Sequence, residues 1–341
     1  MVWTVHTMII KSRAPVRIYF GGGGTDISPY TEEYGGAVLN TAISKYAYTT
    51  LRTNEENKIE ITSADYNKTI TVDHISHLDA GNNLDNLDLI KAIIKKFYPE
   101  YGFEIFLRGD IMPNSGLGNS ASTAVSIISL FNYLNKNKLN NKQIAELAFQ
   151  IETNDLKNVG GRQDQYAASF GGFNLMEFKG NDNVIVKQVN IKKETVMELQ
   201  KRLVLAFIGK REPSGNILKS QQDSYSKRDK IELLDYLKKN TYLMHDYLKE
   251  EKFEEFGKLL SNSWEKKVEL NPNITTQKIE ALRDIASKHG AIGSRNMGAG
   301  RGGHMIFFCR EGREHNVRNA IEQSGAKIVD FNMDNEGVQV W

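Results

Sequence analysis

Apolar and polar residues follow two clear spacings in the middle of the chain. Phe103, Ile105 and Leu107 alternate with polar residues, which predicts a β-strand. Soon afterwards the apolar residues recur every three or four positions, which predicts an amphipathic helix. Its apolar positions are Ala121, Ala124, Val125, Ile128, Phe131 and Leu134. Between strand and helix lies the segment 113–123, PNSGLGNSAST, so a glycine loop is expected at the beginning of the helix.

The same two spacings predict the other elements of the chain. Helices are expected at 85–98, about 141–154, much of 215–290 and about 312–324. Strands are expected at 9–20, 36–52, 58–73, 184–191, 203–208, 305–309, 327–331 and 338–341. This mixture predicts an α+β protein. Because the composition shifts near residue 180, we expect two domains, 1–185 and 186–341.

Composition excludes several classes of function. The chain has 341 residues, 40% hydrophobic and 25% charged, as in a globular protein. A net charge of +2 gives no basic excess for nucleic acid. The single cysteine, Cys309, lies among apolar residues and predicts a buried thiol without a disulfide. No membrane span or signal peptide is predicted, so we expect a cytoplasmic protein.

The loop at 113–123 has the chemistry of an anion site. Gly116 and Gly118 lack a Cβ atom, so the backbone can turn with positive φ and approach a ligand. Ser115, Asn119 and Ser120 add short polar side chains beside the free N–H groups of a helix start. A phosphate chain is the ligand we predict there. The alternative is an ordinary helix capped by serine or asparagine.

Two further glycine clusters flank this loop in the sequence. One, GGGG at 21–24, is followed by Thr25 and Asp26, and Asp26 is suited to sugar hydroxyls or to capping a turn. The other, GAGRGG at 298–303, matches a dinucleotide-binding motif. That motif requires a strand before it and a helix after it, whereas a strand is predicted to follow here, so we exclude a dehydrogenase. P-loop and zinc-enzyme motifs are absent as well.

Two carboxylates are candidates for chemistry. Asp164 lies between glycine pairs at 160–161 and 171–172, on a short predicted helix. It could orient or deprotonate a hydroxyl, or it could simply complement the helix dipole. Glu152 lies near the end of a predicted helix, one residue past the apolar face. From the residues alone, a solvated carboxylate is the simpler interpretation of Glu152.

The three glycine segments together resemble the motifs of the GHMP small-molecule kinases, in order and spacing. These segments are APVRIYFGGGGTD at 14–26, PNSGLGNSA at 113–121 and GAGRGG at 298–303. GGGGTD at 21–26, GGRQDQYAASFGGF at 160–173 and SWEKKV at 263–268 are most similar to D-glycero-D-manno-heptose 7-phosphate kinases. The resemblance covers nearly the whole chain. It implies an N-terminal domain like ribosomal protein S5 and a ferredoxin-like C-terminal α+β domain.

The resemblance also implies an activity. Such an enzyme uses ATP and magnesium to phosphorylate the anomeric hydroxyl of D-glycero-D-manno-heptose 7-phosphate, giving the 1,7-bisphosphate for GDP-heptose and surface polysaccharide. Its partners are therefore ATP and a sugar phosphate, and a homodimer is an open alternative to a monomer. Two other functions stay open: a fucose- or galactose-type sugar 1-kinase, and a catalytically silent sugar or nucleotide sensor.

Site residues are carried over by motif. The implied ATP-binding residues are Pro113, Ser115, Gly116, Leu117, Gly118, Asn119, Ser120 and Ala121. The implied magnesium ligands are Ser120 and Glu152, and the implied catalytic residues are Asp164 and Arg17. The implied substrate-binding residues are Arg17, Gly23, Gly24, Thr25, Asp26, Asp164, Gly298, Gly300 and Arg301. Candidate cations for the sugar's own phosphate are Lys210, Arg211, Lys45, Arg162 and Arg301. The alternative for each of them is a solvated surface cation.

Two residues depart from the family pattern. Asn119 replaces the first serine of the usual GLGSS, and it keeps the ability to donate hydrogen bonds. Arg301 interrupts what is usually a run of glycines, so it could instead reach a substrate phosphate.

Overall fold

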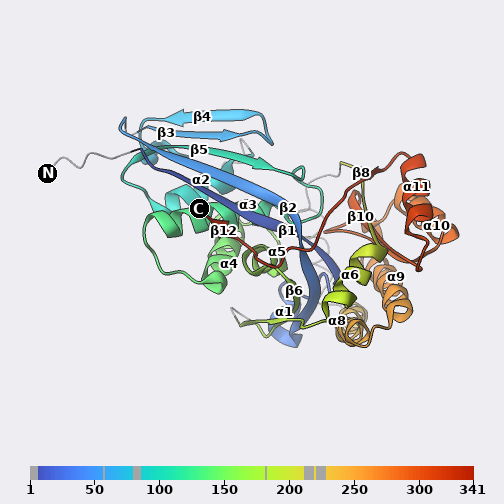
Figure 1. The fold of residues 1–341 in the computed structure, drawn as a ribbon. Helices are drawn as coiled ribbons and strands as arrows, with labels where there is room; N and C mark the ends of the chain where they lie inside the picture. Colours follow the sequence, from blue (N-terminus) through green and yellow to red (C-terminus); the bar gives the residue numbers. More distant parts are fainter. Residues whose placement is uncertain (1–6, 57, 80–85, 181–182, 211–218, 220–227) are drawn as a thin grey trace.

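Two β-sheets lie side by side in the computed structural model, which describes residues 7–56, 58–79, 86–180, 183–210, 219 and 228–341 (Figure 1). The larger sheet has the order β12-β1-β2-β5-β3-β4, and β6 and β7 extend it from β2. Its strands are β1 (Ile9–Gly21), β2 (Gly36–Asn54), β3 (Ile59–Ser63), β4 (Lys68–Val72), β5 (Gly102–Gly109), β6 (Phe173–Phe178), β7 (Val184–Gln188) and β12 (Gln339–Val340). The smaller sheet has the order β11-β8-β10-β9. Its strands are β8 (Leu203–Gly209), β9 (Ala291–Asn296), β10 (Gly303–Cys309) and β11 (Lys327–Ile328).

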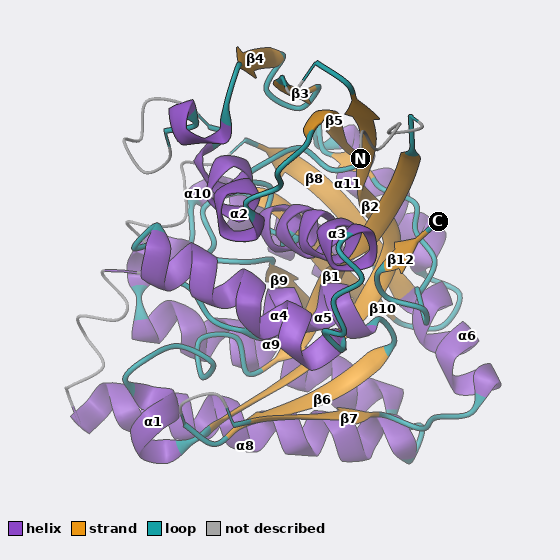
Figure 2. Cartoon of the chain, turned by 90° about the vertical axis from the view of Figure 1, so that its left-hand side faces the viewer, coloured by secondary structure: helices purple, strands orange, loops and turns teal. Residues whose placement is uncertain are grey.

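Helices cover one face of the larger sheet and surround the smaller one (Figures 1 and 2). Those on the larger sheet are α2 (Asp88–Phe97), α3 (Asn119–Leu134), α4 (Asn141–Gln150) and α5 (Gln163–Phe170). Those near the smaller sheet are α6 (Lys193–Arg202), α9 (Phe253–Leu270), α10 (Gln277–Lys288) and α11 (Glu314–Gln323). The long α8 (Arg228–Lys249) packs against α9 and against β1 and β2. Short helices complete the described chain: α1 (Tyr30–Tyr34), η1 (Ile75–His77), η2 (Ile151–Asp155, a π-helix) and η3 (Pro272–Ile274).

The long strand β2 divides the larger sheet into two branches. It pairs with β1 along most of its 19 residues. Its first part, from Gly36, pairs with β6, while its last part, to Asn54, pairs with β5. The β1 strand therefore carries its C-terminal residues into the centre of the molecule, and β5 leads into the glycine loop before α3.

One hydrophobic core joins the two sheets. The ring of Phe20, at the end of β1, packs against Phe256 of α9, and Phe256 packs against Phe308 of β10. Both pairs of ring centroids lie 5.4 Å apart, within the range of favourable aromatic contacts. Burial of these large rings fixes α9 and the smaller sheet against the end of β1.

The central helix differs from its prediction in one respect. Its existence is confirmed, but it is not amphipathic, because nearly every residue from Asn119 to Phe131 is buried. The helix lies between the sheet and its neighbouring helices, so both sides are covered. Serines on it find buried partners: Ser122 Oγ donates to the Pro15 carbonyl over 2.8 Å, and Ser126 Oγ to Thr49 Oγ1 over 2.9 Å.

The remaining predicted elements and the predicted domain boundary agree with the structure only in part. The strands expected at 327–331 and 338–341 shorten to two residues each, while α6 and β9 are elements that periodicity did not predict. The expected boundary at 185/186 falls inside β7, which belongs to the larger sheet. After the smaller sheet, β12 returns to pair with β1. Cys309 is a buried free thiol, as predicted. Within the described residues, no helix combines the length and hydrophobicity needed to cross a membrane.

Candidate active site

The three glycine segments converge on one cleft, although they are far apart in the sequence. Gly23 and Gly24 come from the segment after β1, Gly116 and Gly118 from the loop before α3, and Gly298 from the segment between β9 and β10. Further lining residues come from β1, the start of α3, η2, the segment 159–161, the start of α5 and one residue of α9. Tertiary packing thus produces a single site from the three clusters noticed in the sequence.

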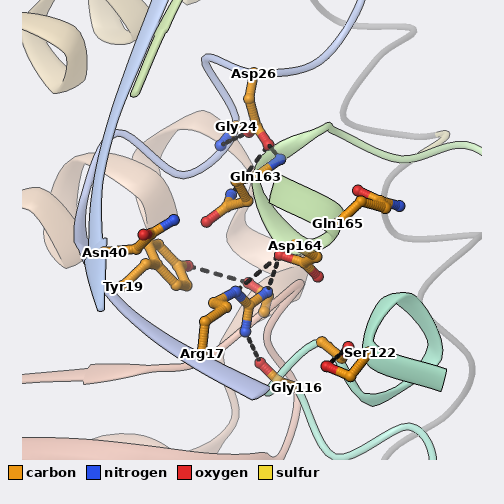
Figure 3. A network of polar contacts seen from close by, with 12 residues as sticks. Arg17, Tyr19, Gly24, Asp26, Asn40, Gly116, Ser122, Gln163, Asp164 and Gln165 are labelled. Atoms are coloured by element: carbon orange, nitrogen blue, oxygen red, sulfur yellow. Dashed lines mark hydrogen bonds and ion pairs between the residues drawn. The ribbon is translucent and has the colours of Figure 1, made fainter. Parts of the chain in front are cut away.

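An ion pair lies at the centre of this cleft (Figure 3). Arg17 of β1 donates from Nε to Asp164 Oδ1 over 2.8 Å, and its Nη2 lies 2.6 Å from the same oxygen. The third guanidinium nitrogen, Nη1, donates to the carbonyl of Gly116 over 2.7 Å. Arg17 is almost fully buried, so its three contacts fix the guanidinium in one position. The carboxylate of Asp164 is thereby held beside the glycine loop.

Backbone geometry explains why glycines occupy this loop. Gly116 and Gly118 have φ values of 90° and 82°, a region that costs other residues about 1–2 kcal/mol. A Cβ atom on Gly116 would lie 2.8 Å from the carbonyl oxygen of Met297. On Gly118 it would lie 3.1 Å from Asp164 Oδ2. Since Gly118 caps α3 without a side-chain hydrogen bond, N–H groups of the first turn are left for a ligand.

The third glycine segment packs against the backbone of the loop before α3. The backbone N–H of His304 donates to the Ser115 carbonyl over 3.0 Å, and His304 Nδ1 lies 2.8 Å from the same oxygen. A Cβ atom on Gly303 would lie 2.2 Å from that oxygen. Only glycine allows the two backbones to approach this closely.

A second carboxylate lies at the end of the cleft formed by the glycine loop before α3. Glu152 Oε1 accepts a hydrogen bond from Ser120 Oγ over 3.3 Å, and Oε2 accepts one from Gln165 Nε2 over 2.8 Å. Burial, and then the nearby charge of Asp164, raise the pKa of the Glu152 carboxyl. A cation placed between these carboxylates would relieve this repulsion.

The donor set fits a magnesium ion shared with phosphate. Within the described residues, no three His, Cys, Asp or Glu side chains group closely enough to hold a metal by themselves. Magnesium, however, usually takes one or two carboxylates and completes its shell with water and substrate phosphates. Ser120 and Glu152, beside the glycine loop, provide a set of that kind.

Several buried polar atoms along the cleft have no hydrogen-bond partner. They are Ser115 Oγ, Asn119 Oδ1, Gln163 Oε1 and Gln165 Oε1. A buried polar group without a partner costs about 1–3 kcal/mol, so such atoms are rare in a folded protein. Their concentration along one cleft indicates a polar ligand that completes these hydrogen bonds.

Asp26 is tied to the backbone around it. Its Oδ1 accepts from the N–H of Gly24 over 3.2 Å, and its Oδ2 accepts from the backbone N–H and Nε2 of Gln163 over 3.4 and 3.1 Å. Asp26 therefore joins the first glycine segment to the start of α5. Burial, and then the charge of Asp164, raise the pKa of Asp26. These hydrogen bonds are those of a residue that caps a turn. Asp26 also lines the cleft, so its binding to sugar hydroxyls stays a prediction.

Comparisons with known proteins decide the family. Residues 88–172 match the model of the GHMP kinase N-terminal domain, and residues 244–327 match that of the GHMP kinase C-terminal domain. A D-glycero-alpha-D-manno-heptose 7-phosphate kinase of Campylobacter jejuni is 33% identical, covering 97% of this chain and 98% of the relative. The chain belongs to the GHMP kinase family. It is thus an ATP-dependent sugar kinase, and the expected α+β GHMP fold is confirmed.

Other GHMP kinases are similar to different degrees. The crystal structure of a D-glycero-D-manno-heptose 1-phosphate kinase from Bacteroides thetaiotaomicron has a TM-score of 0.80 and 30% identity, covering 97% of this chain and 98% of that one. A galactokinase of Thermococcus kodakarensis is 23% identical, covering 95% of this chain and all of the relative. The kinases named for heptose phosphates are therefore the more similar of these relatives.

Most predicted site residues of this GHMP kinase line the cleft, although their individual roles stay predictions. Those in the wall are Arg17, Gly23, Gly24, Asp26, Ser115, Gly116, Gly118, Asn119, Ser120, Ala121, Glu152, Asp164 and Gly298. Five other predicted residues are outside the described lining: Pro113, Leu117, Thr25, Gly300 and Arg301. Thr25 is buried in its own turn, where its hydroxyl donates to the Gly22 carbonyl over 2.8 Å. Arg301 is exposed, and its N–H donates to Ile274.

None of the five predicted anion-binding cations stands in the described wall of the cleft. Lys210 is exposed, Lys45 lies near Asp330, and Arg162 pairs with Glu146 over 3.2 Å. Arg301 faces solvent, as noted above, and Arg211 lies outside the described residues.

Sequence reasoning missed several residues of the wall, among them Tyr19, Gln163, Gln165 and Lys267. One signal for Lys267 was available. On α9 it follows Ser263 and Trp264 along the buried face, where a lysine is unusual. No periodic signal pointed to Tyr19, because in a buried strand a tyrosine reads as part of the core.

Proposed function

We propose that this GHMP kinase transfers the γ-phosphoryl group of ATP to the anomeric hydroxyl of D-glycero-D-manno-heptose 7-phosphate, forming the 1,7-bisphosphate. The observation that carries the proposal is the Arg17–Asp164 pair held against the glycine loop at Gly116. Identities of 33% and 30% to kinases named for heptose phosphates, against 23% for a galactokinase, favour a heptose acceptor. We further propose that the enzyme works in the cytoplasm, where ATP is available.

The positions of the residues support a separate role for each of them in phosphoryl transfer. N–H groups of the loop before α3 bind the phosphates of ATP, and Arg17 offsets charge on the transferring group. Asp164, fixed by Arg17, orients the attacking hydroxyl and accepts its proton as the bond to phosphorus forms. Ser120 and Glu152 would hold magnesium, and the bound ion would supply positive charge that offsets the negative charge of the phosphates. Catalysis thus relies on positioning and charge rather than on a covalent intermediate.

A panel of acceptors tests the proposal. ADP release would be measured with ATP and magnesium for D-glycero-D-manno-heptose 7-phosphate, the corresponding 1-phosphate, unphosphorylated heptose, fucose and galactose. We expect the 7-phosphate to give the highest kcat/KM by at least about tenfold, which corresponds to about 1.4 kcal/mol of discrimination. Phosphorus NMR of the product would locate the new phosphate at the anomeric carbon.

The other outcomes are equally informative. A preference for fucose or galactose would assign a different sugar 1-kinase, and phosphorylation of the heptose 1-phosphate would place the reacting hydroxyl elsewhere. No ADP release from any acceptor would contradict catalysis and favour a sensor. The Asp164→Asn variant is the control that separates turnover at this site from contaminating kinase activity.

A further inference from the structure

A buried tyrosine in the cleft wall is surrounded by three cations. The ring centroid of Tyr19 lies 4.0 Å from the guanidinium carbon of Arg295, 5.4 Å from that of Arg17 and 5.3 Å from Lys267 Nζ. All four residues are at least about nine-tenths buried. They come from three elements: β1, α9 and β9.

Only one of these cations has a carboxylate partner. Arg17 pairs with Asp164. In the part of the chain that the structure describes, neither Lys267 nor Arg295 forms an ion pair. Lys267 Nζ instead donates to Tyr19 Oη over 2.9 Å and to the Gly298 carbonyl over 3.1 Å, and Arg295 Nη1 donates to the Phe20 carbonyl over 2.6 Å.

Two buried cations without a carboxylate in direct contact are expensive for the fold. Removing an ion from water costs several kcal/mol, and neutral hydrogen-bond acceptors recover only part of that cost. Arg295 also leaves Nε without a hydrogen-bond partner. Burial and the neighbouring Arg295 lower the pKa of Lys267, and Arg295, Lys267 and Arg17 together lower the pKa of Tyr19 to about 8 despite its burial. The site therefore has excess positive potential.

This potential opens onto the cleft, since Tyr19 and Lys267 both belong to its wall. The negative charge of Asp26, which borders the first glycine segment, favours the charged form of Lys267 without a direct contact. The nucleotide loop, in contrast, has Arg17 and its own N–H groups for the phosphates of ATP. An anion bound at Lys267 would thus belong to the second substrate.

We infer that Lys267, held by Tyr19 and supported by Arg295, binds the phosphate group that the sugar substrate already carries. This inference rests on the proposed function, because it requires a phosphorylated acceptor. Lys267 contributes its positive charge and the one N–H donor that is not used by Tyr19 or Gly298. Tyr19 fixes the position of the ammonium group, and Arg295, next to the Tyr19 ring, adds positive electrostatic potential. The cluster would then select sugar phosphates over free sugars.

A matched pair of lysine variants tests the inference by kinetics. Lys267→Met removes the buried charge, while Lys266→Met removes its partly exposed neighbour, which pairs with Glu269 over 2.7 Å. We expect Lys267→Met to raise KM for the heptose 7-phosphate about 10–100-fold, as for loss of a charged hydrogen bond of about 1.5–3 kcal/mol. KM for ATP and for unphosphorylated heptose should stay unchanged, and Lys266→Met should resemble the wild type. An equal loss for phosphorylated and free sugar, or a loss confined to ATP, would overturn the inference.

Tyrosine ionisation provides a readout that does not depend on turnover. Ultraviolet titration of the intact protein should show one tyrosine with a pKa of about 8, absent from Tyr19→Phe. Saturating inorganic phosphate should raise this pKa, because a bound anion disfavours the phenolate. Lys267→Met should abolish the effect of phosphate, whereas Lys266→Met should retain it. If heptose 7-phosphate is not a substrate, the proposed function fails, yet this titration still decides whether an anion binds here; a pKa insensitive to phosphate would contradict the site.

Discussion

The two sides of the cleft carry opposite unbalanced charges. At the loop before α3, Glu152 contacts Ser120 and Gln165 but has no basic partner in the described chain, and burial and the charge of Asp164 raise its pKa. At the other side, Lys267 and Arg295 are buried around Tyr19 without a carboxylate in contact. Arg17 lies between the two and is balanced by Asp164. The acidic side fits a metal ion, and the basic side fits a phosphate.

This contrast shows that a folded protein can hold charged groups in place before ligands of opposite charge bind. Lys267 and Arg295 are buried, and Glu152 and Asp164 are partly buried. The loss of hydration costs free energy, and an ion of opposite sign offsets that cost when it binds.

The reacting centre should be most sensitive to Asp164. Asp164→Asn keeps the shape of the side chain and an oxygen for Arg17, but it removes the negative charge that aims the hydroxyl. We expect kcat to fall about 10²–10⁴-fold, with KM for both substrates changed little. Steady-state kinetics on the purified variant measures this. Unchanged turnover would remove Asp164 from the mechanism.

The acidic side should control the metal requirement. Glu152→Gln should raise the magnesium concentration for half-maximal activity about 10–100-fold, since loss of even an outer-shell partner costs that much. Asp155→Asn is the matched control, because Asp155 lies on the same short helix but faces Lys96 at 4.0 Å. Magnesium titrations at saturating ATP compare the two. Equal curves for both variants would assign Glu152 a purely structural place.

The close approach of the second and third glycine segments should appear as stability. Gly116→Ala places a methyl group against the Met297 carbonyl at a φ of 90°, so we expect a loss of about 1–3 kcal/mol in the free energy of unfolding. Gly160→Ala is the control, because its Cβ would meet nothing within 4 Å. Denaturant unfolding of both variants gives the comparison. Similar losses at both positions would show that the contact between the segments is not specific.

The smallest effect should be a pH-dependent gain in stability. The raised pKa of Glu152 means that ionisation penalises the folded state above the folded pKa, and that the penalty disappears as pH falls below the unfolded value. Without magnesium, Glu152→Gln should therefore raise the melting temperature at neutral pH, with the gain vanishing near pH 4. Gln165 can present its free Oε1 to the new amide. A gain that is equal at both pH values would contradict this account.

Much of the site could be predicted from local sequence because its chemistry is local. Gly116 and Gly118 are required by positive φ and by the beginning of a helix, and both features leave a mark within a few residues. Asp164 was a candidate because glycine pairs flank its helix. The prediction that α3 is amphipathic was wrong because the structure covers both sides of this helix. Periodicity cannot show that serines on α3 form hydrogen bonds with buried residues far away in the sequence.

The three glycine segments, the α+β class and the resemblance to GHMP kinases can be predicted from the sequence, since they depend on residue types and on motif spacing along the chain. The contacts of Arg17 with Asp164, 147 residues away, and of Lys267 with Tyr19, 248 residues away, depend on how the chain folds. Lys267 meets Tyr19 because the aromatic core fixes α9 against β1. Asp164 meets Arg17 because α5 packs against β1. Electrostatic interaction depends on distance in space and on burial, and a linear sequence specifies neither until the chain has folded.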